Sequence, residues 1–351
     1  MSFSSKLIDW YLQNKRDLPW RLTNDAYKIW LSEIMLQQTR VAQGLDYFKT
    51  FENHFPTIFD LAKADEQLVL KLWQGLGYYS RARNLHYTAK YIVEHHDGKF
   101  PSEFSEIKKL KGVGDYTASA IASIAFDKPH AVVDGNVYRV LSRVFGIDTP
   151  INSTEGIKEF KSLAQSLIDT NQSGNYNQAI MEFGAMQCKP KNPNCEDCPL
   201  QDMCIAFEKK QIDQLPVKLK KTKVRNRYFN YLVVLSSDGK TILNQRTQKG
   251  IWQNLYEFPL IESESISNEK KILTTEEFKN YKFENFDLSL YNKTPIVHKL
   301  SHQHLHTQFW ILEIQNDRNS NINWEEIDNY PVPVLIANFL KSFRHNIKSF
   351  L

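Results

Sequence analysis

The chain of 351 residues is 42% hydrophobic and 13% aromatic, with 44 Lys and Arg against 40 Asp and Glu. This length allows two substantial cores, and the formal charge of +4 is only mildly basic. No apolar run approaches the eighteen or so residues of a membrane span, and the N-terminal residues do not form a signal-peptide pattern. We therefore expect a cytoplasmic protein with reduced thiols.

The first two thirds of the chain, including residues 26–51 as one stretch, repeat apolar residues three and four positions apart, which predicts helices. In the segment SEIMLQQT, Glu33 stands among apolar residues. Burial beside such neighbours makes a carboxylate hold its proton more tightly, as a general acid requires. A solvated or salt-bridged helix glutamate fits the same segment, so both interpretations stay open.

Two later segments combine glycine with the start of a helix. In LKGVGDYTASA, Gly112 and Gly114 frame a tight turn whose backbone N–H groups could approach a phosphate. In VVDGNVYRVLSR, Asp134 precedes an amphipathic helix and is either a catalytic carboxylate or an ordinary N-cap. Neither segment identifies a function by itself, since many helix–turn–helix junctions carry such a turn.

All four cysteines lie within residues 188–204, as Cys188, Cys195, Cys198 and Cys204. Thiols grouped this closely cannot form disulfide bonds between distant segments of the chain. In a reducing compartment such a group of thiols typically binds a metal. The spacing contains one C-x2-C pair, whereas structural zinc sites typically use two such pairs. Four thiolates suit zinc and an iron–sulfur cluster alike, so the spacing leaves both open.

The segment PVKLKKTKVRNR, residues 216–227, holds six Lys and Arg and no acid. It predicts a basic linker that is either solvated or in contact with phosphates. After it, NYLVVLSSDGKTILNQR (residues 230–246) predicts a hairpin about an Asp-Gly turn, followed by further strands and a terminal helix. We therefore expect an all-α domain over residues 1–215 and a smaller α+β domain over residues 228–351.

Together these motifs resemble one superfamily. LKGVGDYTA, VDGNVYRVLSR and the spacing of the four cysteines are similar to the helix–hairpin–helix DNA glycosylases of the endonuclease III superfamily. LPWR, YKIWLSEIMLQQTRV and LWQGLGYYSRARNLH resemble the adenine DNA glycosylases of the MutY type. The resemblance implies a multi-domain fold: an all-α helix–hairpin–helix glycosylase domain with an iron–sulfur loop, then an α+β Nudix-like domain. It also implies one 4Fe–4S cluster on the four cysteines, with zinc as the less favoured alternative.

The resemblance further implies base-excision repair of adenine mispaired with 8-oxoguanine or guanine in duplex DNA. Cleaving an N-glycosidic bond requires a proton for the leaving base and a carboxylate beside the cationic sugar. The resemblance assigns these roles to Glu33 and Asp134, and positioning roles to Tyr116 and Asn136. A lysine in place of Tyr116 would form a Schiff base and cut the strand, so the phenol implies a monofunctional glycosylase.

Before this chemistry the adenine must leave the base stack. The resemblance assigns residues to the adenine pocket (Arg16, Arg21), to insertion into the duplex (Gln38 and Tyr78, with Gln37 adjacent) and to recognition of 8-oxoguanine (Ser301, His302). The turn of Gly112 and Gly114 stays a candidate for phosphate binding through its backbone N–H groups. Leu300 replaces the aromatic residue that the family carries before this serine. Because His302, His304 and His306 alternate onto one strand face, metal binding there is a competing interpretation.

Two rival functions belong to other classes. A catalytically inactive, or a bifunctional, endonuclease III-like DNA-binding protein would keep the fold and the cluster. An 8-oxo-nucleotide hydrolase would need a Nudix box, the Glu-rich metal-binding pattern, and the second domain has none. We expect a monomer that binds duplex DNA and no membrane, located in the cytoplasm and with the nucleoid if the source is bacterial.

Overall fold

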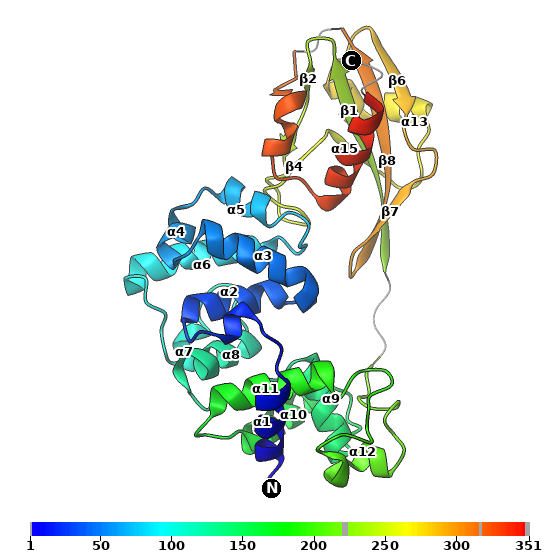
Figure 1. Cartoon of the computed structure of the whole chain (residues 1–351). Coiled ribbons are helices and arrows are strands. Elements are labelled where there is room, and N and C mark those ends of the chain that lie inside the picture. Colours follow the sequence, from blue (N-terminus) through cyan, green and yellow to red (C-terminus); the bar gives the residue numbers. More distant parts are fainter. Residues whose placement is uncertain (1, 220–223, 316–317, 348–351) are drawn as a thin grey trace. The chain divides into compact units, whose positions relative to one another are not determined.

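The computed structural model describes residues 2–219, 224–315 and 318–347, without the side chains of residues 345–347 (Figure 1). Within these limits the chain packs into two units, one from residues 2–64 and 83–219 and the other from residues 65–82, 224–315 and 318–347. Residues 65–82 thus pack with the C-terminal strands, although their sequence is as helical as that of their neighbours. None of the helices in the described segments is long and apolar enough to cross a membrane.

The first unit is helical, as the sequence predicts. Local signals set the helix ends: Asp25 accepts a hydrogen bond from the backbone of Tyr27 at the start of α2, and Gly146 ends α9 in the left-handed conformation. The first three residues of α6 belong to the second unit. The helices are α1 (Phe3–Asn14), η1 (Pro19–Arg21), α2 (Ala26–Leu36), α3 (Val41–His54), α4 (Ile58–Lys63), α6 (Ser80–His96), α7 (Phe104–Ile107), α8 (Asp115–Phe126), α9 (Gly135–Phe145), α10 (Thr154–Leu167), α11 (Ser173–Met186), η2 (Gln201–Met203) and α12 (Ile205–Glu208).

Four helices of this unit, α2, α8, α9 and α11, form the core that positions the site. Helix α8 packs against α2 and α11, and α11 also packs against α1 and α9. Every residue of α8 from Thr117 to Ile124 is buried, and its small alanines let the neighbouring helices approach closely. Helix α2 is buried from Ile29 to Met35. Glu33 therefore belongs to a buried helix and not to a solvated face.

The helical pattern of residues 26–51 is interrupted between α2 and α3. Gln38 has a φ of 58°, in the left-handed region, and Thr39 donates from its backbone N–H to the carbonyl oxygen of Leu36 (3.1 Å). The prediction of continuous helix is wrong over this turn. Because periodicity reports apolar spacing and not single left-handed residues, it gives no sign of the break. The turn leaves Gln38 exposed just beyond the helix that carries Glu33.

The second unit is built on a sheet with the strand order β5–β1–β8–β6, and β7 pairs with β8 as well. Strands β1 and β8 are parallel, and the other pairs are antiparallel. Helix α15 covers one face, where the ring of Phe339 stacks on Phe309 with 3.9 Å between centroids (Figure 1). The elements are α5 (Glu66–Leu72), β1 (Arg225–Ser236), β2 (Lys240–Thr241), β3 (Asn244–Gln245), β4 (Tyr256–Glu257), β5 (Leu260–Ser263), α13 (Glu269–Thr274), α14 (Glu276–Asn280), β6 (Phe286–Leu290), β7 (Ile296–Lys299), β8 (Gln303–Ile314), β9 (Ile322–Asn323), η3 (Trp324–Asn329) and α15 (Val334–Ile347).

The hairpin predicted for residues 230–246 does not form. The turn itself is present, because the N–H of Gly239 donates to the carbonyl oxygen of Ser236 (3.0 Å). However, β1 already has β5 on one edge and β8 on the other, so β2 pairs with β9 in a separate sheet. The sequence predicts the turn correctly but predicts the wrong partner for β2. Because β1 is a central strand, neither of its edges is free to pair with β2.

The basic linker predicted for residues 216–227 is partly described. Residues 220–223 lie outside the described residues. Before them, the carbonyl oxygen of Val217 accepts from the backbone of Ile151 (3.0 Å), and Leu219 exchanges two hydrogen bonds with Asn152 (2.8 and 3.1 Å). After them, Arg225 begins β1. The backbone of the described residues of this segment thus forms hydrogen bonds with Ile151 and Asn152 on one side of the gap and within the sheet on the other.

Candidate active site

A cavity of about 590 Å³ lies in the first unit among η1, α2, α8, α9 and α11. Its lining gathers residues that the sequence assigns to catalysis and to the adenine pocket. They come from five separate places in the chain: Arg16, Arg21, Glu33, Tyr116, and Asp134 with Asn136. The residues assigned to insertion and to phosphate binding do not line this cavity.

Glu33 contributes a buried carboxyl group, 8% exposed, from the middle of α2. Burial raises the pKa of this group to about 7. The charge of Asp134 also raises the pKa, whereas a hydrogen bond with Tyr116 and the charge of Arg21 lower it. A carboxyl group with this pKa is protonated in a large share of molecules at neutral pH, as a general acid must be.

Asp134 is both the N-cap of α9 and a carboxylate of the cavity, so the two interpretations of the sequence are compatible. Its Oδ1 accepts from the backbone N–H groups of Asn136 (2.9 Å) and Val137 (2.8 Å), and its Oδ2 accepts from Asn136 Nδ2 (2.9 Å). Burial raises the pKa of Asp134, and these hydrogen bonds and the charge of Arg139 oppose the rise. Hydrogen bonds to the carboxylate favour its ionised form.

Tyr116 of α8 joins the cavity to α11. Its hydroxyl group donates to Met181 Sδ at 3.0 Å, and its interaction with Glu33 shifts the pKa values of both groups. Burial raises the pKa of Tyr116 well above its usual range, and the charges of Glu33 and Asp134 raise it further. The phenol is therefore neutral at physiological pH, and it has no amine with which to form a Schiff base.

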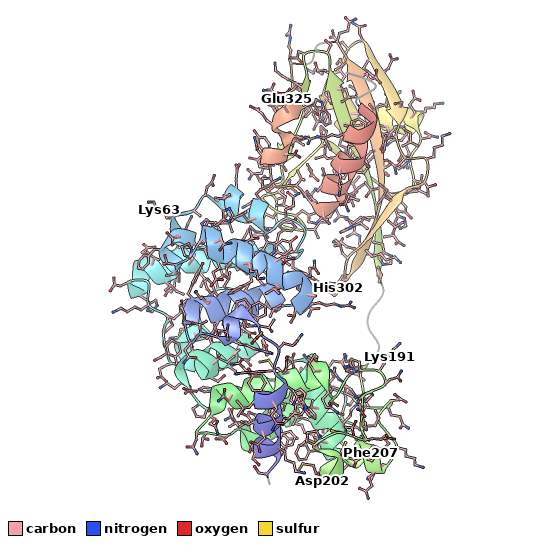
Figure 2. The ribbon with its side chains drawn as sticks, in the orientation of Figure 1. Lys63, Lys191, Asp202, Phe207, His302 and Glu325 are labelled. Carbon is pink, nitrogen blue, oxygen red and sulfur yellow. The ribbon has the colours of Figure 1, made fainter. Side chains whose placement is uncertain are left out.

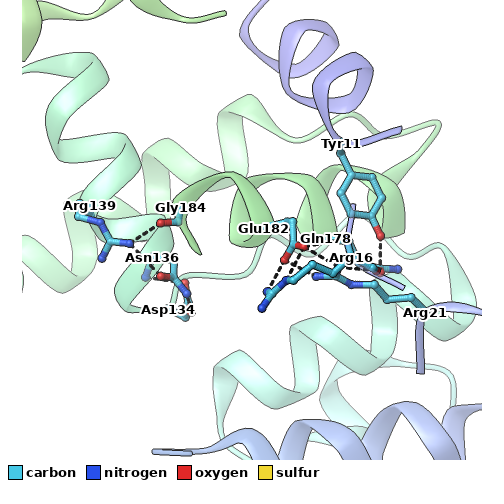
Figure 3. Close-up of polar contacts among 9 residues, drawn as sticks. All are labelled: Tyr11, Arg16, Arg21, Asp134, Asn136, Arg139, Gln178, Glu182 and Gly184. Carbon is cyan, nitrogen blue, oxygen red and sulfur yellow. Dashed lines mark hydrogen bonds and ion pairs between the residues drawn. The ribbon is translucent and has the colours of Figure 1, made fainter. Parts of the chain in front are cut away.

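Glu182 of α11 fixes both predicted arginines in the cavity wall (Figure 3). Its fully buried carboxylate accepts from Arg16 at Nε (2.7 Å) and Nη2 (2.5 Å), and from Arg21 at Nη1 (2.9 Å) and Nη2 (2.7 Å). Burial alone would raise the pKa of Glu182, but the hydrogen bonds from the two arginines outweigh burial and hold the pKa at about 2. The arginines are thus already bound to an internal carboxylate.

The sequence motifs do not single out Glu182, although it is the one charged residue of α11 (SGNYNQAIMEFGAM). A lone acid in an otherwise uncharged, buried helix needs an internal partner, and this signal could have identified it. Gly184 follows on the same helix, and a Cβ atom there would lie 2.6 Å from Asn136 Cβ. The glycine therefore allows α11 to approach the start of α9, where Arg139 donates to the carbonyl oxygen of Gly184 (2.5 Å) and to Asn136 Oδ1 (2.9 Å) (Figure 3).

The two glycines of the predicted hairpin form an exposed turn that opens into α8. Gly112 has a φ of 83°, in the left-handed region that favours glycine. A Cβ atom there would also lie only 2.8 Å from Asn84 Cβ, so both the backbone conformation and the available space favour glycine. Thr88 of α6 donates its hydroxyl hydrogen to the carbonyl oxygen of Lys111 (2.9 Å) and holds the turn in place. Gly114 is the N-cap residue of α8. The start of a helix therefore lies at the surface, where it can face an anion.

In the second unit, Tyr78 and Ser301 meet although 223 positions separate them in the chain. The hydroxyl oxygen of Tyr78 lies 2.5 Å from Ser301 Oγ. Tyr78 is 51% exposed and has a φ of 48°. Ser301 and His302 lie in the exposed turn between β7 and β8, and Figure 2 labels His302 there. Two segments that the sequence assigns to DNA recognition are thus adjacent.

Of the three histidines predicted to share a strand face, His304 and His306 lie in β8 and His302 lies in the turn before it. His306 stacks on Tyr228 with 4.9 Å between ring centroids, and its Nε2 lies 3.2 Å from Asn226 Oδ1. Among the residues that the structure describes, no three His, Cys, Asp or Glu side chains lie where they could hold one metal ion together. The competing interpretation of this strand therefore gains no support.

The cysteine loop is attached to two buried arginines of α9. Arg143 Nη1 donates to the carbonyl oxygen of Lys189 (2.7 Å) and lies 3.5 Å from Cys188 Sγ. Arg139 Nε donates to the carbonyl oxygen of Cys188 (2.8 Å). Because α9 begins at the cap residue Asp134, one helix joins the cysteine loop to the catalytic cavity.

Burial and mutual repulsion oppose the ionisation of three of the four thiols in the absence of a metal. Burial raises the pKa of Cys198 to about 11, and the charges of the three other cysteines also raise it. Cationic iron would offset both effects. In a cubane cluster each thiolate binds a different iron, so the sulfurs stand further apart than around one zinc ion. Among the described residues no three His, Cys, Asp or Glu side chains are placed to hold a single ion, and this includes the four cysteines.

A larger cavity of about 780 Å³ lies in the second unit, at one end of β1, β6 and β8. Its lining includes the carboxylates of Asp287, Glu313 and Glu325, and it contains none of the residues singled out from the sequence. The predicted chemistry is therefore confined to the smaller cavity.

Family models match three parts of the chain. Residues 31–165 match the HhH-GPD superfamily of base excision DNA repair proteins, and residues 230–342 match the NUDIX domain. Residues 188–204 match the iron-sulfur binding domain of endonuclease III. These matches confirm the expected multi-domain fold. They also confirm the 4Fe–4S cluster as the cofactor of the four cysteines, in preference to the zinc alternative.

Curated relatives and solved structures agree with the family models. An adenine DNA glycosylase of Buchnera aphidicola subsp. Schizaphis graminum is 36% identical over 334 residues, 93% of each chain. That of Mus musculus is 47% identical over 223 residues, 61% of this chain and 43% of its own. A thermostable thymine-DNA glycosylase is similar in structure, with a TM-score of 0.55 and 31% identity over 59% of this chain and 95% of its own. By these relatives, and in agreement with the resemblance of its motifs, the chain belongs to the adenine DNA glycosylase family.

Proposed function

We propose that the chain is a monofunctional, monomeric DNA glycosylase that removes adenine mispaired with 8-oxoguanine, or with guanine, from duplex DNA. One observation carries the proposal: Glu33, with a pKa of about 7, shares a cavity with Asp134, whose oxygens accept three N–H hydrogen bonds. The environments of the two carboxylates differ in the way that an acid and an ionised stabiliser require.

In the proposed reaction, Glu33 gives its proton to a ring nitrogen of the adenine. The bond between C1′ and the base then breaks, its electron pair stays with the base, and an oxocarbenium-like sugar remains. The Asp134 carboxylate stabilises this cation, and the ionised Glu33 accepts a proton from the water that attacks C1′. Tyr116 shares the cavity with Glu33 and affects its pKa, and Asn136 donates to Asp134 (2.9 Å), so both can position the pair.

The adenine reaches the cavity only after it leaves the base stack. We assign the filling of the resulting gap to the exposed turn after α2, where Gln38 is exposed and Gln37 is held by Thr117 (3.2 Å). Arg16 and Arg21, which Glu182 fixes, form a wall of the adenine pocket. The hairpin glycines 112 and 114 bind a DNA phosphate through backbone N–H groups and the start of α8.

Recognition of 8-oxoguanine is assigned to Ser301 and His302, with Tyr78 beside them. 8-Oxoguanine differs from guanine by a carbonyl at C8 and a hydrogen on N7, and a hydroxyl group can pair with either. The contact between Tyr78 and Ser301 (2.5 Å) supports a joint role for the two residues. In this proposal residues 1–215 form the glycosylase domain and residues 228–351 the recognition domain, which works together with residues 65–82.

The test uses labelled duplexes with adenine opposite 8-oxoguanine or guanine, and a thymine:adenine duplex as the control. Incubation followed by alkali should produce breaks at the mispaired adenine alone. Breaks without alkali would indicate a bifunctional enzyme, and retention of duplex without breaks would indicate a DNA-binding protein. Hydrolysis of an 8-oxoguanine nucleoside triphosphate with no breaks would indicate a nucleotide hydrolase.

A further inference from the structure

Met181 lines the catalytic cavity, yet no step of the proposed reaction uses it. It lies on α11, half-buried, and its Sδ accepts the hydroxyl hydrogen of Tyr116 at 3.0 Å. A thioether can accept a hydrogen bond but has no hydrogen to donate. In this contact the phenol is therefore the donor, and its hydroxyl hydrogen points to the sulfur.

The phenol has one hydrogen and two neighbours that can accept it. Glu33 lines the same cavity, and its interaction with Tyr116 lowers the pKa of Glu33, as a hydrogen donated by the phenol would. While the hydrogen points to Met181, the phenol oxygen faces Glu33 as an acceptor, and only a protonated carboxyl group can donate to it. If the hydrogen turns to Glu33 instead, it stabilises the carboxylate. The thioether and Glu33 thus compete for one hydrogen, and the outcome favours one or the other protonation state of the acid.

We propose that Met181 is a positioning residue that keeps Glu33 in its proton-donating form by accepting the hydroxyl hydrogen of Tyr116. The inference rests on the proposed role of Glu33 as the acid. The charged and titratable groups that share the cavity with Glu33 are Arg16, Arg21, Arg40, Tyr116, Asp134, Arg139 and Glu182. Among them Asp134 and Arg21 act on Glu33 in opposite directions, and Glu182 pairs with Arg16 and Arg21. Met181 carries no charge, so its effect on the protonation of Glu33 adds to the effects of these charged groups.

The test is Met181→Leu in the cluster-loaded protein, which keeps an apolar side chain of similar size and removes the acceptor. Single-turnover excision of adenine opposite 8-oxoguanine is measured as a function of pH. The rate falls as Glu33 ionises, so the midpoint of this fall should move to lower pH by about one unit in the variant. At about pH 8 the rate should drop about tenfold, and at about pH 5.5 it should stay within about twofold of the parent.

Two further variants separate this role from packing. Met181→Gln keeps an unbranched chain and supplies an amide oxygen, so its midpoint should match that of the parent. In a Tyr116→Phe background the contested hydrogen is gone, and Met181→Leu should then leave the midpoint unchanged. Such a dependence of one substitution on the other is the sign of a direct coupling.

Titration of the Glu33 carboxyl group by carbon-13 NMR, assigned with Glu33→Gln, gives a readout that needs no activity. Its pKa should fall by about one unit in Met181→Leu. Equal midpoints in parent and variant, a shift that persists in the Tyr116→Phe background, or a loss of rate by one factor at every pH would each overturn the inference. Absence of adenine excision by the parent would overturn the proposed function instead, and the NMR titration would still decide whether Met181 and Glu33 compete.

Discussion

Replacing Glu182 with glutamine measures how much the carboxylate between two arginines contributes to folding. The fully buried carboxylate has a pKa of about 2, against an ordinary value of 4.5. A lowering of roughly 2.5 units corresponds to roughly 3 kcal/mol in favour of the folded, ionised form, since one unit equals about 1.4 kcal/mol. The ion pair is therefore expected to be a large single contribution to the stability of the first unit.

Glutamine keeps the size of the side chain but leaves Arg16 and Arg21 without a counter-charge in the cavity wall. Breaking a buried pair in this way typically costs about 3–5 kcal/mol. Glu52→Gln is the matched control in the same unit, because it breaks a half-exposed pair with Lys28 (2.7 Å) and should cost less than about 1 kcal/mol. The measurement is urea unfolding of the cluster-loaded protein at neutral pH, followed by circular dichroism. Equal losses in the two variants would refute the reasoning.

The same pair predicts how stability depends on pH. Since the pKa of Glu182 is lowered by folding, its stabilisation is complete above about pH 4.5 and is lost as the pH falls towards 2. The difference in unfolding free energy between the parent and Glu182→Gln should shrink through this range. A difference that stays constant down to low pH would show that lost packing, and not lost charge, causes the destabilisation.

Three further outcomes follow from the cluster, the phenol and the β7–β8 turn. Purified protein should be yellow-brown with about four irons per chain, and Cys198→Ser should lower iron content and DNA affinity; stoichiometric zinc without iron would contradict the cofactor. Because Tyr116 has no amine, borohydride should trap no covalent complex with DNA, and efficient trapping would contradict monofunctional chemistry. Ser301→Ala combined with His302→Ala should lower the preference for 8-oxoguanine:A over G:A duplexes by an amount equivalent to about 1–3 kcal/mol, measured as a ratio of single-turnover rates. An unchanged ratio would show that this turn does not recognise 8-oxoguanine.

The sequence predicted those parts of the site that depend on local patterns. Asp134 was placed correctly because an acid before Gly-Asn and an amphipathic helix caps that helix, and the structure places it so. Gly112 was singled out because it frames a tight turn into a helix, and its φ of 83° lies in the left-handed region that favours glycine. The apolar neighbours of Glu33 predict a buried carboxyl group as one of two interpretations, and burial is the largest cause of its raised pKa.

The sequence could not predict which distant residues would meet. Arg16 and Glu182 are 166 positions apart, and Tyr78 and Ser301 are 223 apart. The partner of β2 was missed for the same reason, since strand pairing depends on which edges of β1 are already occupied. The packing of residues 65–82 with the C-terminal unit also depends on such contacts, for example the hydrogen bond from the backbone of Val332 to Gln74 (3.3 Å).

The central claim is that Glu33 supplies the proton that releases adenine, and Glu33→Gln tests it most directly. Glutamine keeps the shape of the side chain but cannot transfer a proton. The measurement is the single-turnover rate of adenine release from an 8-oxoguanine:A duplex, together with the Kd for the same duplex. The rate should fall by at least about 100-fold, as expected when a general acid is lost, while the Kd should stay close to that of the parent. Adenine release at a near-parent rate by Glu33→Gln would contradict the account.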